Sequence, residues 1–129
     1  MVFGFLKVKN MADIAVEQEL SIAVMNLIAT EEHLAFTAAK TGRQEYLELY
    51  NAVRKLRSRH MKEIVKNKNG EVWCASKHLL STTMRLIEAA IKFGALGNKK
   101  KAMELLEDSI EAYKIFWFLQ SFAEEEAKK

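Results

Sequence analysis

Three polar side chains interrupt the apolar faces of two expected helices, and their types suit acid–base or anion-binding chemistry. Glu31 falls near the centre of one apolar face, and Arg57 and His60 fall on the other. If these helices are antiparallel, the long Arg57 side chain reaches the level of Glu31 at a rise of about 1.5 Å per residue. Because a buried charge is costly unless it is paired, we predict a Glu31–Arg57 ion pair, with His60 and Tyr113 hydrogen-bonded nearby.

The same four residues have a functional interpretation as a small-ligand site inside a helical bundle. Arg57 would then hold an anion, and His60 would act as an acid or a base. The structural interpretation is favoured, because a small error in a predicted helix boundary moves such residues to the edge of a face.

Arg54 and His60 form a further pattern, an arginine followed within two helical turns by a histidine. The spacing resembles the arginine–spacer–histidine motif of HEPN-type ribonucleases, which are small helical bundles that dimerise. The resemblance implies that His60 is a general base and that Arg54 stabilises a phosphate. In that family the motif belongs near the later helices, whereas here it falls on the second. An HEPN-like ribonuclease or RNA-binding bundle is therefore the alternative function.

Metal chemistry is not indicated by the spacing of potential ligands. A di-iron bundle needs a glutamate three residues before a histidine on two helices. Thr30, Arg57 and Ala75 occupy those positions before the three histidines. Cys74 and His78 stand one turn apart, but two ligands are too few for a zinc site. We expect no metal and no cofactor.

A cluster of lysines at the expected start of the last helix suggests an anion site. Lys99, Lys100 and Lys101 oppose the helix dipole there, and Lys40 and Arg43 would lie at the same end of a bundle. With the free backbone N–H groups, these cations could hold a phosphate or sulfate. The favoured interpretation is that these lysines slightly lower the stability of the helix, a loss that an exposed helix end tolerates.

A basic ridge follows the outer face of the second expected helix, formed by Lys55, Arg59, Lys62 and Lys66. Such a ridge attracts nucleic acid. More commonly it is a solvated face whose charge is neutralised by acidic residues elsewhere. Nucleic acid is therefore a secondary candidate partner.

Four expected helices position all of these residues. Gly42, Gly70 and Gly97 mark the breaks between them, and the chain contains no proline. Long helices joined by short loops predict an all-α fold, an antiparallel up-and-down four-helix bundle. We expect one domain over residues 1–129, with a short tail at residues 1–10 and helices at residues 11–39, 43–67, 71–94 and 98–126.

Small residues predict close packing on the third helix, where Ser76, Thr83 and Ala90 recur every seven positions. Residues 90–113, AIKFGALGNKKKAMELLEDSIEAY, resemble the helical hairpins of tetratricopeptide repeats and MIT domains, with a Gly-Asn turn before a helix that Asn98 caps. A tetratricopeptide array requires repetition of the pattern, which this chain lacks. General hairpin packing explains the segment, and no function is transferred.

Apolar and aromatic residues surround the last expected helix over residues 113–122, YKIFWFLQSF, and the first helix also carries a second apolar line. Such helices are either covered on two sides or expose a surface to a partner. The leading interpretation is a non-enzymatic oligomerising or scaffold protein that binds its own copies or another helical protein. The predicted interface comprises Ile22, Met25, Phe36, Ile115, Phe118 and Phe122.

Composition sets the remaining expectations. The net charge of +3 and the pI of about 9.0 are mildly basic, below the usual value for a dedicated nucleic-acid-binding domain. The single cysteine, Cys74, permits no internal disulfide and fits a reducing compartment. The apolar run at residues 2–6 is too short for a signal peptide, and a weak surface anchor there is less favoured than a tail. We expect a cytoplasmic protein without a membrane span.

Overall fold

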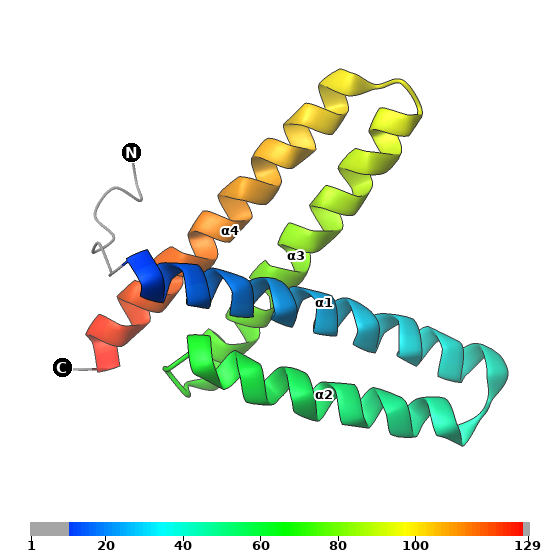
Figure 1. Ribbon diagram of the computed structural model, residues 1–129, viewed down its shortest axis with the longest axis horizontal. Helices are drawn as coiled ribbons and strands as arrows, with labels where there is room; N and C mark the ends of the chain where they lie inside the picture. Colours follow the sequence, from blue (N-terminus) through cyan, green and yellow to red (C-terminus); the bar gives the residue numbers. More distant parts are fainter. Residues whose placement is uncertain (1–10, 128–129) are drawn as a thin grey trace. The chain divides into compact units, whose positions relative to one another are not determined.

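The computed structural model describes residues 11–127, with side chains from Ala15 onward, and its regular elements in that range are helices (Figure 1). The all-α prediction with four helices is confirmed. The largest boundary difference is at the end of the second helix, which stops at Ile64 and leaves Lys66 beyond it. The predicted tail and the apolar run at residues 2–6 lie outside the described residues. The helices are α1 (Met11–Thr41), α2 (Gln44–Ile64), α3 (Gly70–Ala95) and α4 (Lys99–Ala127).

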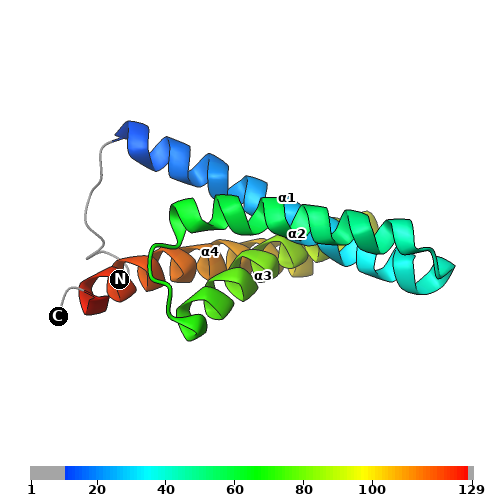
Figure 2. The ribbon, with the colours of Figure 1, turned by 90° about the horizontal axis from the view of Figure 1, so that it is seen from below.

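The helices form two compact units, each an antiparallel hairpin. Hairpin 1 contains α1 and α2, and hairpin 2 contains α3 and α4; Figure 2 shows both pairs from a second side. The helices within each hairpin are joined by a short turn, as an up-and-down topology requires. That both hairpins belong to one domain stays a prediction.

Glycine and asparagine define the helix ends, as the sequence predicts for two of the three breaks. Gly42 and Gly97 adopt φ angles of +68° and +85°, which L-residues with a side chain rarely tolerate. Asn98 Oδ1 accepts a hydrogen bond of 3.1 Å from the Lys101 amide and caps α4, as predicted. Gly70 differs, because it is the first residue of α3, and Asn69 caps that helix by accepting from the Glu71 amide at 2.8 Å.

Small and polar residues form the buried seam of hairpin 2. Ser76, Thr83 and Ala90 are all buried, so the predicted inward line on α3 is confirmed. Ser109 Oγ donates to the Thr83 carbonyl at 2.9 Å, and Gln120 Nε2 donates to Ser76 Oγ at 2.8 Å. These bonds replace the hydrogen bonds to water that the polar groups lose when they are buried. The buried residues of α4 are Ser109, Ala112, Phe116, Gln120 and Ala123.

The buried face of α1 in hairpin 1 differs from the predicted one. Met25, which was predicted to lie on an exposed interface, is only 4% exposed, whereas Val16 is 58% exposed. Apolar residues occur nearly all round α1, so periodicity alone does not select one face. The face that is buried comprises Ser21, Val24, Met25, Ile28 and Glu31, and its counterpart on α2 comprises Arg57, Met61 and Ile64.

Candidate functional site

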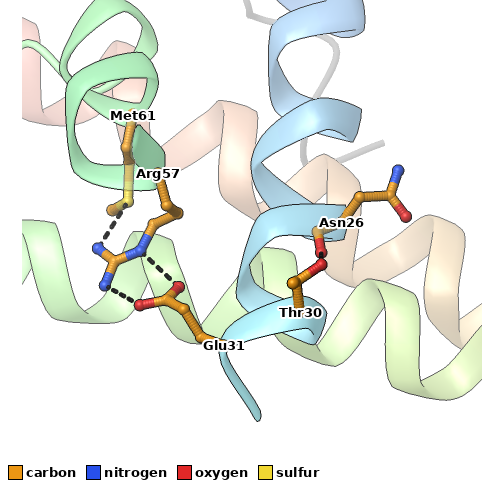
Figure 3. A network of polar contacts seen from close by, with 5 residues as sticks. All are labelled: Asn26, Thr30, Glu31, Arg57 and Met61. Carbon is orange, nitrogen blue, oxygen red and sulfur yellow. Dashed lines mark hydrogen bonds and ion pairs between the residues drawn. The ribbon is translucent and has the colours of Figure 1, made fainter. Parts of the chain in front are cut away.

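Glu31 of α1 and Arg57 of α2 form a buried ion pair, as predicted (Figure 3). Arg57 Nε donates to Glu31 Oε2 at 2.9 Å, and Arg57 Nη2 donates to Glu31 Oε1 at 3.0 Å. The side chains are only 4% and 6% exposed. This fork-to-fork geometry is the strongest arrangement available to an arginine and a carboxylate. It joins α1 to α2 at one fixed register.

The Glu31 and Arg57 side chains satisfy most of each other's hydrogen-bonding groups. Both carboxylate oxygens of Glu31 accept from the guanidinium, and the remaining nitrogen, Nη1, lies 4.0 Å from Met61 Sδ, one turn along α2. On α1, Thr30 Oγ1 donates to the Asn26 carbonyl at 2.8 Å, and both of these side chains point away from Arg57 in Figure 3. Because the two charges satisfy each other, the arrangement suits a structural cross-link better than an anion-binding arginine.

His60 is not joined to this pair through Nδ1. That atom is buried and has no hydrogen-bond partner among the described residues. Glu63 Oε2 lies 3.7 Å away, too far for a hydrogen bond. Tyr113 belongs to hairpin 2, where its ring packs edge-on against Trp117 with centroids 6.0 Å apart. The predicted contact of Tyr113 with the ion pair, and a ligand role for these residues, stay predictions.

Arg54 and His60 do not share a face of α2. They are six positions apart, so their side chains leave the helix about 120° apart around its axis and about 9 Å apart along it. Arg54 is exposed, whereas the imidazole of His60 is only 35% exposed. A general base and a phosphate-stabilising cation must both reach the same phosphate of the substrate. These two side chains diverge within a single chain, which disfavours the ribonuclease interpretation.

The residues of the predicted anion site fall on both hairpins. Arg43 Nη2 lies 2.9 Å from Glu45 Oε2, and this hydrogen bond lowers the pKa of the Glu45 carboxyl, assisted by a backbone hydrogen bond. Lys101 Nζ lies 3.9 Å from Glu104 Oε2. Two of the five cations therefore already have carboxylate neighbours. Anion binding by Lys40, Arg43, Lys99, Lys100 and Lys101 stays a prediction.

Apolar residues lie on the outer side of α4, and among them Ile115 and Phe122 are exposed. Ile115, Phe118 and Phe122 lie at least about 100° around the helix from the buried Phe116. Phe122 is 50% exposed, and its ring centroid lies 6.2 Å from that of the half-buried Phe118. We call these three residues the α4 apolar surface. On α1, Ile22 and Phe36 are also exposed, whereas burial removes Met25 from the predicted interface.

No metal or membrane-spanning feature is found in the described part of the chain. Within residues 11–127, no group of three His, Cys, Asp or Glu side chains is placed to hold a metal ion. Among the same residues, no helix combines the length and hydrophobicity that a bilayer span requires. Cys74 is an exposed thiol, and His78 is likewise exposed.

Comparison with known protein families, curated proteins and solved structures gives no match for this chain. A functional proposal therefore depends on the chemistry of the chain's own residues.

Proposed function

We propose that this protein is a non-enzymatic, self-associating helical protein that uses the α4 apolar surface together with Ile22 and Phe36 of α1. The observation that carries the proposal is the exposure of large apolar side chains, with Phe36 at 68% and Phe122 at 50%. Within α4, the ring of Phe122 lies 6.2 Å from that of Phe118 between centroids, and paired aromatic residues at a surface are typical anchors of protein interfaces.

Interface size supports the participation of both helices. A stable interface buries about 800 Å² on each partner, which is more than three side chains supply. Ile22 and Phe36 are exposed apolar residues two heptads apart on α1 and about 40° apart around its axis, so they add exposed apolar area. The second copy of the chain is the favoured occupant, because every copy carries the same apolar residues and a twofold-symmetric dimer pairs one patch with itself.

The placement of the candidate reactive groups of α1 and α2 also supports a non-enzymatic role. In the described residues, the buried Glu31 and Arg57 are occupied with each other, and Arg54 and His60 leave α2 in different directions. An HEPN-like ribonuclease remains the alternative, but it would need a second motif to complete its site.

The test is Phe122→Asp, measured by native mass spectrometry and by light scattering at matched concentrations. We expect the wild type to give a defined multimer and the variant to give a smaller particle with unchanged helicity. Ile91→Asp is the matched control, because Ile91 is an apolar residue of comparable exposure on α3, outside the proposed interface. A monomeric wild type, or an unchanged mass for Phe122→Asp, would refute the proposal.

A further inference from the structure

A ridge of cations on α2 is exposed along one side of the helix. Lys55, Arg59 and Lys62 are all exposed, and they lie within about 60° of one another around the axis. Within the described residues, no ion pair or hydrogen bond engages any of these three side chains. We call them the α2 basic ridge. Their charges are available to a partner.

The net charge of the whole chain understates this local concentration. Residues 54–68 contain seven basic residues and one acidic residue, whereas the chain as a whole carries +3, so the remainder is net negative. Of the seven, only Arg57 is neutralised internally, by Glu31. The one acidic residue, Glu63, lies 3.7 Å from His60 and one helical turn from Arg59, so it offsets only a small part of this positive charge. The local field therefore favours a polyanion.

We propose that the α2 basic ridge binds the phosphate backbone of a nucleic acid. Its three cations span about 10 Å along the helix, which matches about three nucleotides at a rise of 3.4 Å for each nucleotide of a strand. Long, flexible lysine and arginine side chains reach phosphates without reading the bases, so binding is independent of sequence.

The neighbours of the ridge favour nucleic acid over a lipid surface. The residues that flank the three cations on the same side of α2 are polar or small, namely Glu48, Asn51, Ala52 and Ser58. A helix that lies on a membrane needs large apolar residues beside its cations. The exposed leucines of α2, Leu47 and Leu49, are in its first turns and lie off the ridge. The ridge shares no residue with the surface proposed for self-association, so this proposal does not depend on that one.

The experiment measures how tightly the full chain binds a fluorescent 20-nucleotide RNA strand and a 20-base-pair DNA duplex at several salt concentrations. Each probe is about as long as the binding site of a small nucleic-acid-binding protein. The test variant is Lys55→Glu/Arg59→Glu/Lys62→Glu. The matched control, Lys77→Glu/Arg85→Glu/Lys92→Glu, changes the net charge by the same amount at basic residues of α3 that belong neither to the ridge nor to the predicted anion site. Circular dichroism verifies folding, and the corresponding triple glutamine variant replaces any charge reversal that unfolds the protein.

We expect the ridge variant to bind at least about tenfold more weakly than the wild type, with a shallower dependence on salt because about three phosphate contacts are lost. The affinity of the control variant should stay within about threefold of the wild-type affinity, a smaller change than the loss of one phosphate contact would cause. Preference between the RNA and the duplex identifies the nucleic acid involved. Equal weakening in both variants, no binding by the wild type at low salt, or binding only to vesicles of phosphatidylserine and phosphatidylcholine would overturn the proposal.

Discussion

Each of the two hairpins packs two antiparallel helices together, but the residues between the helices differ in their chemistry. Hairpin 1 places a full ion pair, Glu31 with Arg57, between its helices. Hairpin 2 places small residues there and joins its helices with neutral hydrogen bonds from Ser109 and Gln120. Leu80 and Phe116 supply the large, fully buried apolar side chains of that hairpin.

This difference determines how each hairpin responds to substitution. A buried ion pair contributes little net stability while both partners are present, but loss of one partner leaves an uncompensated charge. A seam of small residues depends on close approach of the backbones, so it is sensitive to added volume. Hairpin 1 should therefore be vulnerable to loss of charge, and hairpin 2 to gain of size.

The largest expected effect is that of Glu31→Gln, which preserves shape but leaves the Arg57 guanidinium buried without a counter-charge. We expect the free energy of unfolding to fall by about 3–5 kcal/mol. Urea denaturation measures the total loss, and amide hydrogen exchange locates it in α1 and α2.

The double variant Glu31→Leu/Arg57→Met is the control for this prediction. It removes both charges at similar volume, so it should restore most of the stability that Glu31→Gln loses. A loss below about 1 kcal/mol for Glu31→Gln would mean that water screens the pair as it screens a surface pair. The contrast between the hairpins would then disappear.

A smaller effect is expected from Ala90→Leu in hairpin 2. Ala90 is buried at the predicted seam, and near the same end a Cβ at Gly94 would lie 4.0 Å from Ala102 Cβ. The larger side chain should separate the helices and lower the free energy of unfolding by about 1–3 kcal/mol. Ala75→Leu on the exposed side of α3 is the matched control. Equal melting temperatures for the two variants would show that the seam is not tightly packed.

The smallest expected effect is at the turns. Asn98→Ala removes the cap of α4 and should lower the free energy of unfolding by about 1 kcal/mol. Thermal denaturation measures the loss, and hydrogen exchange at the Lys101 amide should increase. If that amide exchanges no faster in the variant, the Asn98 side chain does not cap the helix in solution.

Arg43→Gln provides the corresponding change in hairpin 1. Arg43 lowers the pKa of the Glu45 carboxyl, so their interaction is present above the ordinary carboxylate pKa and is lost as the pH falls through the folded-state pKa. The substitution should raise the pKa of Glu45, as measured by NMR titration. Because both side chains are exposed, we expect a smaller change in stability than for Asn98→Ala.

Local signals in the sequence account for what it predicts correctly. Glycine at a left-handed turn and asparagine at a helix start act within a few residues, so Gly42, Gly97 and Asn98 locate helix ends without knowledge of the fold. The heptad of Ser76, Thr83 and Ala90 likewise marks one side of α3. The Glu31–Arg57 pair follows from the cost of burying either charge alone.

By itself, then, the sequence determined the all-α class, the helix order and the partner of Glu31. The tertiary structure decided which side of α1 is buried, because apolar residues surround that helix and only the position of its neighbours distinguishes Met25 and Ile28 from Val16. It also decided that His60 Nδ1 lies without a hydrogen-bond partner among the described residues, because a hydrogen bond requires a distance and an angle that spacing along the chain does not specify.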